Sequence, residues 1–498
     1  MTSPKLRTAH FASLFLSLIA LLFSNMGLAQ TSTETDTAPE ARIRQVENGL
    51  RPLVVDENTV FGNIESQMRK YKVQGLSMAV IDGYRVAWAK GYGSTGNPEA
   101  PQVDASTVFQ VGSISKFVNA VAVLKLAEGG TIELDKEINA QLSSWKLPYD
   151  TEFGATAISP RLLLAHAAGL STHGFGGYRN ATKLPSLVEI LDGRKPANST
   201  KVRQVQTVGS TFRYSGGGTT ILQLLVTDQV EPSYERFVAE TVFDTLGMKA
   251  SFFSVESEKY PKNRSFAHLH NGKPLKNDYQ YYPESAAAGL WTTPTDLAKL
   301  IIDLQKSLER DQGTVLSQST LTQMVSPPLE DSNAGLGLFV EKKGSDTYLQ
   351  HSGANRGFTG QFYFSAENGK GVVIFLNSPN TQIIDEIIRS VASVYAWPGY
   401  EQLKVSSKQE LQALDFSRFL GTYSFGKRRV TVSEKKGSLV LAEKGKWRTV
   451  LTPLTDTTFV ANGIRPEATI EFVAGADGQI ASCKIIQGQP TEWTKQQE

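Results

Sequence analysis

A serine and a lysine three residues apart, Ser113 and Lys116, form the first pair in the chain that could do chemistry together. Residues 117–126 are apolar and rich in alanine, and Gly129 and Gly130 follow, which predicts a buried helix with the pair at its start. Side chains three apart share one helix face. A hydroxyl there lies in the positive field of the helix N-terminus, with an amine in reach to take its proton. The pair predicts a nucleophile, although a helix cap and a solvated lysine have the same spacing.

Two later stretches supply the other groups that a serine nucleophile needs. Such a nucleophile requires a base, a group that passes the proton to the leaving atom, and donors for the oxyanion. Tyr214 lies on a turn flanked by glycines, from which its hydroxyl can reach a nearby site. His351, Ser352 and Gly353 lie at the end of a predicted strand, and the small Ser352 and Gly353 would let a substrate lie along the strand edge. We therefore expect these stretches to meet Ser113 in one site.

Other catalytic chemistries have little support. The chain contains no H-E-x-x-H and no G-x-S-x-G motif. His166 sits in an apolar segment, where a structural histidine is expected. His268 and His270 lack an acid or cysteine cluster, so we interpret them as loop residues. We expect neither a metal nor a cofactor.

The chain begins with a predicted signal peptide, residues 1–29. Lys5 and Arg7 give a positive start, residues 11–23 an apolar core, and residues 27–29 a cleavage site of small residues. A retained anchor is the alternative, but the apolar run is too short to span a bilayer comfortably. No cysteine follows the run, which excludes a lipoprotein anchor there. We expect export to the bacterial periplasm, with no membrane span after cleavage.

Charge and cysteine content restrict the partners. Lysine and arginine number 51 against 49 acidic residues, a net charge of +2. Removal of Lys5 and Arg7 brings it to 0, because residues 1–29 carry no acidic residue. A neutral chain without basic runs indicates no nucleic-acid partner. Cys483 is the only cysteine and can form no internal disulfide, so stability must come from the core.

Hydrophobic periodicity predicts an α+β domain over residues 56–400, preceded by a flexible leader at residues 30–55. Asp82-Gly83 joins two strands within residues 75–91. Helices are expected at residues 160–168, 219–226, 233–246, 295–308 and 381–395, and late strands at 335–340, 348–353, 360–364 and 371–377. Early strands, central helices and late strands favour an antiparallel sheet flanked by helices.

A second, all-β domain is predicted at residues 413–498, after a linker at residues 401–412. Six short strands follow at regular spacing, at residues 419–423, 430–432, 439–441, 458–460, 470–472 and 480–486. The pattern is typical of a small antiparallel barrel or sandwich. No cluster of acids, bases or metal ligands occurs there.

Three motifs in the expected order carry a family resemblance across residues 75–377. Phe-Gln-Val-Gly-Ser-Ile-Ser-Lys at residues 109–116 matches S-x-x-K, residues 214–216 match Y-x-N, and residues 351–353 match K-T-G. The chain resembles the serine β-lactamase and penicillin-binding protein superfamily. The branch is that of class C β-lactamases, DD-peptidases, D-aminopeptidases and family VIII-type esterases. The C-terminal domain resembles the lipocalin-like domains appended to some members.

The resemblance implies a β-lactamase/transpeptidase-like fold and a role for each matched residue. Ser113 would be the acylated nucleophile and Lys116 its proton acceptor. Tyr214 would be the general base or proton relay, its phenolate favoured by Lys116. The N–H groups of Ser113 and Ala354 would form the oxyanion hole. The implied reaction is attack on a carbonyl, an acyl-enzyme, and then hydrolysis or transfer.

The resemblance implies that the substrate contacts Gly216, His351, Ser352 and Gly353. Two of these residues depart from the family motifs. Gly216 replaces an asparagine that contacts the substrate amide. His351 replaces a lysine that binds a substrate carboxylate, and a neutral imidazole is a poorer carboxylate anchor. Arg356 could compensate or could be a surface arginine. Esterase, amidase or peptidase activity is therefore expected over efficient β-lactam hydrolysis.

The function predicted from sequence is that of an exported serine hydrolase acting on an ester, an amide or a peptide. D-amino-acid-containing peptides, β-lactam-like compounds and peptidoglycan fragments are the candidate substrates or partners. The alternative is a non-catalytic penicillin-recognising or peptidoglycan-binding protein with degraded second and third motifs. The sequence leaves the oligomeric state open.

Overall fold

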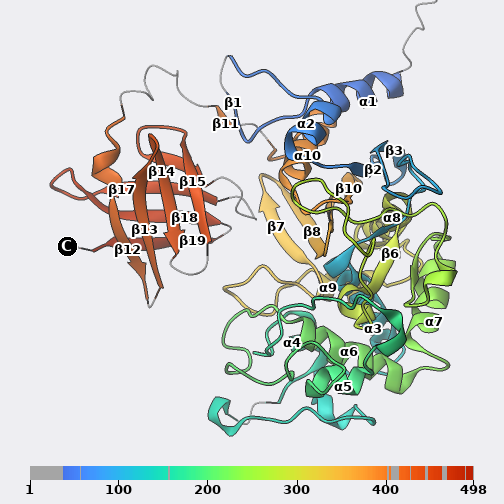
Figure 1. Ribbon diagram of the computed structural model, residues 1–498. Coiled ribbons are helices and arrows are strands. Elements are labelled where there is room, and N and C mark those ends of the chain that lie inside the picture. Colours follow the sequence, from blue (N-terminus) through green and yellow to red (C-terminus); the bar gives the residue numbers. More distant parts are fainter. Residues whose placement is uncertain are drawn as a thin grey trace, which may run out of the picture.

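A computed structural model of the chain describes residues 38–55, 58–154, 157–400, 403–404, 414–426, 428–443, 447–461, 468–487 and 489–496 (Figure 1). The predicted signal peptide and most of the predicted linker lie outside these residues. None of the helices in these ranges combines the length and apolar character that a membrane crossing requires. The described residues confirm the predicted α+β class, with an antiparallel sheet and helices followed by a separate β-barrel.

The first domain is built on a six-stranded antiparallel sheet. The two strands of the early hairpin pair in this sheet with four strands from the end of the domain. The strand order is β3-β2-β10-β9-β8-β7. The strands are β2 Gly75–Ile81, β3 Val86–Gly93, β7 Phe339–Lys343, β8 Asp346–Asn355, β9 Phe358–Ser365 and β10 Gly371–Leu376. β2 pairs with β3 through the predicted hairpin and with β10 on its other side.

The predicted strand at residues 335–340 is displaced in the structure. β7 begins only at Phe339, because Gly337 adopts a φ of +83° and the Gly335 N–H donates to the Leu338 carbonyl. That backbone forms a turn, which positive φ favours at glycine. The apolar alternation of this segment therefore belongs to a turn that leads into the edge strand.

Three helices cover one face of the sheet: α1 Ala38–Asn48, α2 Ile64–Tyr71 and α10 Gln382–Val394 (Figure 1). α1 corrects our prediction of a flexible leader at residues 30–55 for the part that the structure describes, residues 38–55. Its last turn buries Val46 completely, and Leu50 after the helix is also fully buried. The apolar residues of this leader pack against α10, and burial of such a side chain stabilises a fold by roughly 1.5–3 kcal/mol.

The other face carries the larger core and most of the helices. Regular helices on this side are α3 Ser115–Glu128, α4 Pro160–Leu164, α5 Leu187–Asp192, α6 Gly216–Gln229, α7 Tyr234–Val238, α8 Pro294–Arg310 and α9 Gln318–Met324. Two π-helical segments are η5 Ala239–Asp244 and η7 Ser285–Gly289. Short 3₁₀ turns are η1 Gly112–Ile114, η2 Ile138–Ala140, η3 Thr151–Phe153, η4 Ala181–Lys183 and η6 Ser257–Lys259. A small sheet orders β4 Phe109–Gln110, β6 Leu290–Thr292 and β5 Phe252–Phe253.

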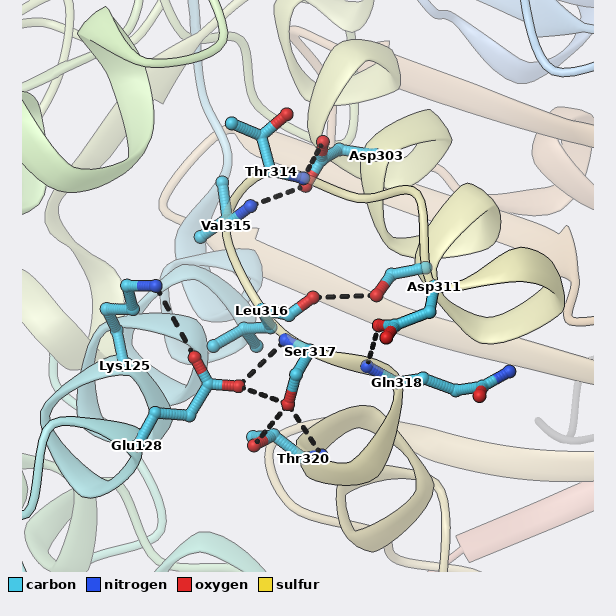
Figure 2. A network of polar contacts seen from close by, with 11 residues as sticks. Lys125, Glu128, Asp303, Asp311, Thr314, Val315, Leu316, Ser317, Gln318 and Thr320 are labelled. Carbon is cyan, nitrogen blue, oxygen red and sulfur yellow. Dashed lines mark hydrogen bonds and ion pairs between the residues drawn. The ribbon is translucent and has the colours of Figure 1, made fainter.

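Helix α3 runs through the middle of this core and is anchored at its C-terminal end by a polar network (Figure 2). Glu128 accepts hydrogen bonds from the backbone N–H and the hydroxyl of Ser317, both at 2.7 Å. Asp303 of α8 accepts the N–H groups of Thr314 and Val315 at 2.7 and 3.0 Å. The connection between α8 and α9 is thereby tied to the end of α3. We call these contacts the Glu128 network.

Two short strands join the start of the chain to the segment before the barrel. β1 Val54–Val55 pairs in parallel with β11 Leu403–Lys404. The two strands form a sheet of their own, apart from the six-stranded sheet.

The C-terminal domain is a closed antiparallel barrel of eight strands, which excludes the sandwich alternative. It comprises η8 Phe416–Phe419 and the strands β12 Gly421–Phe425, β13 Arg428–Lys435, β14 Ser438–Glu443, β15 Trp447–Pro453, β16 Thr458–Ala461, β17 Ala468–Ala474, β18 Ile480–Gln487 and β19 Gln489–Lys495. β15 and β19 were not predicted. Phe419, Phe459 and Phe472 pack together inside, with ring centroids 4.6–5.5 Å apart, and Cys483 is buried with them.

Candidate functional site

The three predicted motifs meet in one cavity of about 660 Å³ between β8, α3 and the turn before α6. The cavity is lined by seven of the residues singled out from the sequence, namely Ser113, Lys116, Tyr214, His351, Ser352, Gly353 and Ala354. Gly216 is not among the lining residues, but a Cβ built on it would contact His173 and Phe175, which are. Arg356 is exposed and is not among the lining residues, which favours its interpretation as a surface arginine.

Ser113 stands on η1, one turn before Lys116 in the first turn of α3. The hydroxyl of the neighbouring Ser115 donates to the Gly112 carbonyl at 2.6 Å and accepts the Leu290 N–H at 3.0 Å. This bridge ties η1 to β6. It fixes the turn that presents Ser113 to the cavity.

Lys116 is the centre of the site. Its Nζ donates to the Ser113 Oγ at 3.0 Å and to the Ala287 carbonyl at 2.7 Å. Only 3% of the residue is exposed, and no carboxylate in the described part of the chain lies within ion-pair distance of Nζ. Burial lowers the pKa of Lys116 to about 7, because a buried ammonium is poorly solvated. At neutral pH a large share of the side chain is therefore a free amine, able to accept a proton.

Tyr214 lies beside this amine. The Lys116 Nζ is 5.1 Å from the centroid of the tyrosine ring. Burial raises the pKa of Tyr214 to about 12, against a smaller lowering from the Ser113 hydroxyl. The phenol is therefore protonated at neutral pH, and the phenolate that the resemblance implied is disfavoured. Of the two roles expected for Tyr214, the arrangement supports the proton relay.

His166 holds the turn that carries Tyr214. Its Nδ1 accepts the Ser215 N–H at 3.2 Å, and its backbone carbonyl accepts the Arg213 N–H at 2.8 Å. Burial, followed by the charge of Lys116, lowers the pKa of His166 well below its usual value, so Nδ1 keeps its lone pair. This geometry agrees with the structural role expected from the sequence.

His351 faces the cavity as a neutral imidazole. Burial and the nearby Lys116 lower its pKa to about 3. Its Nδ1 is 2.6 Å from the Ser352 carbonyl, so this nitrogen is the donor. Nε2 is buried and has no hydrogen-bond partner among the described residues. The third motif therefore offers a lone pair in place of the positive charge of a lysine.

Two glycines allow β8 to approach the nucleophile closely. A Cβ on Gly353 would lie 1.9 Å from the Val111 carbonyl oxygen, and one on Gly112 would lie 2.6–2.8 Å from backbone atoms of Ala354. Gly112 also has a φ of +52°, which glycine adopts without steric cost. Pairing of β8 with β7 ends at Gln350. The edge of β8 beyond that residue therefore faces η1, which brings the backbones of Ser113 and Ala354 together.

Several lining groups carried no signal in the sequence. The Ala287 carbonyl belongs to the irregular π-helical segment η7, whose geometry has no simple sequence pattern. Aromatic rings outside the motifs also line the cavity: His173, Phe175, Phe212, Phe339, Tyr363 and Tyr400. The first two lie in a stretch rich in glycine, which we interpreted only as a surface excursion near the site.

Comparison with known proteins identifies proteins that are similar to this chain in sequence or in fold. A family model described as "Beta-lactamase" matches residues 60–395. Protein flp of Staphylococcus aureus (strain MRSA252) is 20% identical over 331 residues, which are 65% of this chain and 63% of that protein. The chain thus spans less than two thirds of the length of this relative.

Two solved structures share the fold at low sequence identity. The octameric penicillin-binding protein homologue from Pyrococcus abyssi has a TM-score of 0.58 at 21% identity and covers 86% of this chain and 98% of its own. The D-amino acid amidase from Ochrobactrum anthropi SV3 has a TM-score of 0.55 at 19% identity, covering 71% of this chain and 99% of its own.

Proposed function

The chain belongs to the Beta-lactamase family, and from that premise we propose that it is a serine hydrolase that forms an acyl-enzyme on Ser113. The observation that carries the proposal is the contact between the Ser113 Oγ and the buried Lys116 Nζ, 3.0 Å apart. A serine is a weak nucleophile until an adjacent base removes its proton. A lysine with a pKa near 7 is such a base at neutral pH.

Acylation follows from the positions of these groups. Neutral Nζ takes the Ser113 proton while Oγ forms a bond to the substrate carbonyl carbon. The N–H groups of Ser113 and Ala354 stabilise the oxyanion. As the carbonyl re-forms and the bond to the leaving atom breaks, the Tyr214 phenol donates its proton to that atom and regains one from the Lys116 ammonium. Water then attacks the ester of Ser113 by the same transfers in reverse, which releases the acid.

The substrate class we propose is a carboxylic ester or amide, including peptides and D-amino acid derivatives. The neutral His351 supports this choice, because it provides no positive charge for the carboxylate of a β-lactam or of a peptide C-terminus. The D-amino acid amidase among the structural neighbours makes amides a reasonable class to assay. We also propose export, on the basis of the signal-like residues 1–29.

One observation favours a second candidate, a penicillin-recognising or peptidoglycan-binding protein without turnover. Gly216 gives the second motif no side chain for hydrogen bonding to an amide. Retention of the Ser113–Lys116 contact and of Tyr214 beside it favours the hydrolase.

The test is an assay of the purified full chain with p-nitrophenyl acetate, nitrocefin and a fluorescent penicillin, beside Ser113→Ala. We expect ester turnover that Ser113→Ala abolishes, and an acyl adduct on Ser113 seen by intact mass. Ser210→Ala, an exposed serine outside the cavity lining, serves as the matched control. Equal behaviour of the parent and Ser113→Ala on every substrate would refute the hydrolase. Penicillin labelling without ester turnover would support the binder.

A further inference from the structure

Aromatic rings form a continuous series around the nucleophile. Ring centroids are 4.8 Å apart for His173 and Tyr214, 6.3 Å for Tyr214 and His351, and 5.5 Å for His351 and Phe339. Phe339 is 5.9 Å from Phe212 in an edge-to-face contact. All five rings line the cavity that contains Ser113. One side of the cavity, running from the residue beside the Lys116 amine to Phe212, is therefore lined by aromatic rings.

Phe175 completes this lining beside the second motif. A Cβ on Gly216 would lie 3.2 Å from the Phe175 Cε2 and 3.1 Å from the His173 carbonyl oxygen. A side chain at position 216 would press against the Phe175 ring, which would have to shift by a few tenths of an ångström. The glycine and the phenylalanine are thus packed against each other, and the Phe175 ring lies next to the position that has no side chain. We call Phe175, Phe212 and Phe339, with the ring of His173, the aromatic wall.

The wall is apolar and partly uncovered. Phe212 keeps 37% of its surface exposed, although phenylalanine gains strongly from burial. Burial, with smaller contributions from Lys116 and Arg213, lowers the pKa of His173 below its usual value, so its ring is neutral at neutral pH. An apolar surface that opens onto a nucleophile favours an apolar group on the molecule that is attacked.

We propose that the site selects substrates carrying an aromatic or similarly bulky apolar group beside the scissile carbonyl, held against the aromatic wall. The inference rests on the proposed hydrolase function and specifies its substrates. The apolar group can belong to the acyl part or to the alcohol or amine part. The two cases share the same recognition chemistry and are separated by the choice of ester.

The test compares three esters on the full chain by titration of the released acid. Ethyl acetate is the reference, ethyl phenylacetate places the ring on the acyl side, and benzyl acetate places it on the alcohol side. The variants are Phe175→Ala and Phe212→Ala. Phe175→Leu is the conservative variant, and Phe425→Ala, a barrel phenylalanine that is 45% exposed, is the matched control.

We expect kcat/KM for one or both aromatic esters, relative to ethyl acetate, to fall about tenfold in Phe175→Ala and in Phe212→Ala. Activity on ethyl acetate should fall by a clearly smaller factor than activity on the aromatic esters, and Phe175→Leu should retain most of the preference. Phe425→Ala should behave as the parent. An unchanged ratio, or equal losses on all three esters, would overturn the proposal.

A binding measurement separates this inference from the hydrolase proposal. Ser113→Ala cannot form an acyl-enzyme, so the affinities of phenylacetamide and acetamide can be compared on it by calorimetry or ligand-observed NMR. Tighter binding of phenylacetamide, weakened about fivefold or more when Phe175→Ala is added, supports the wall even if no ester is turned over. Equal binding of the two amides to Ser113→Ala would overturn the proposed role of the aromatic wall, even if Ser113 hydrolyses ethyl acetate.

Discussion

The two ends of helix α3 solve opposite physical problems. At the N-terminal end, the Lys116 amine is buried without a carboxylate partner in the described part of the chain, and its proton is held weakly. At the C-terminal end, the Glu128 carboxylate is partly exposed and accepts two hydrogen bonds from Ser317, with Lys125 3.4 Å away (Figure 2). At the N-terminal end the positive charge of Lys116 is destabilised by burial. At the C-terminal end the negative charge of Glu128 is stabilised by hydrogen bonds.

This difference shows how one helix can combine reactivity with order. Burial of an amine without an ion partner is costly, and only a well-determined surrounding structure maintains it. The Glu128 network and the fully buried middle of α3 hold the helix in place and so maintain the buried amine. We infer that the two ends are separable: changes at Lys116 alter chemistry, whereas changes at Glu128 alter stability.

The largest effect is expected from Lys116→Met. This variant removes the base and keeps most of the side-chain volume, so kcat/KM on an activated ester should fall by about 10³-fold or more. Steady-state kinetics on p-nitrophenyl acetate, with circular dichroism to verify the fold, measures it. A loss of less than tenfold would mean that another group accepts the Ser113 proton.

The pH dependence of kcat/KM should follow the protonation of the Lys116 amine. Lys116 accepts a proton only when neutral, so kcat/KM should fall about tenfold for each pH unit below its pKa of about 7 and level off above it. His351 is neutral from about pH 4 upward and should not contribute in this range. A profile that keeps rising to pH 10 would instead indicate an amine with an ordinary pKa.

Removal of the carboxylate at the other end should cost stability. Glu128→Ala removes the acceptor of the Ser317 N–H and hydroxyl. Both hydrogen bonds lie near the surface and the hydroxyl keeps Thr320 as a partner, so the free energy of unfolding should fall by about 1 kcal/mol. Urea denaturation measures the change, and kcat at 25 °C should stay within about twofold. A large drop in kcat at unchanged stability would show that the two ends are coupled.

Lys116→Met should also raise stability in acid. The pKa of Lys116 is lower in the folded chain than in the unfolded chain, so the unfolded state binds more protons between about pH 7 and pH 10.5. Stability of the parent therefore rises with pH in that window, and the cost of the charge is complete below it. At pH 6 the variant should gain about 1 kcal/mol, because loss of the bond to the Ala287 carbonyl offsets part of the relief. A loss at pH 6 would contradict this.

The smallest effect is expected from Lys125→Ala. Its ion pair with Glu128 is 3.4 Å long and the lysine side chain is 40% exposed, so the free energy of unfolding should change by less than about 0.5 kcal/mol. Beside Glu128→Ala, this variant separates the backbone hydrogen bonds of the network from its ion pair.

Local pattern was sufficient for the parts of the site that lie within single elements. Ser113 on η1 and Lys116 on α3 lie three residues apart where η1 runs directly into α3, and His351 lies on strand β8. The protonation and the hydrogen bonding of each group could not be predicted from the local sequence. The lowered pKa of Lys116 and the free Nε2 of His351 depend on burial by segments distant in the sequence.

Irregular and polar segments account for the parts of the fold that were missed. β19 contains Pro490, which disfavours a strand prediction, yet it closes the barrel by pairing with β12. Phe175 lies among glycines, so its place beside Gly216 appears only when loop and helix meet. α1 is short and polar, and packing on α10 stabilises it more than its own propensity does.

The parallel pair of β1 and β11 determines where the protein can be divided. β11 lies between the first domain and the barrel, yet its backbone hydrogen bonds go to residues near the start of the chain. A shortened protein that ends before Leu403 would expose the backbone of Val54–Val55 as an unpaired edge, which invites pairing with another chain. Separation of the two domains for expression should therefore keep Leu403–Lys404 with the first domain and start the barrel after them.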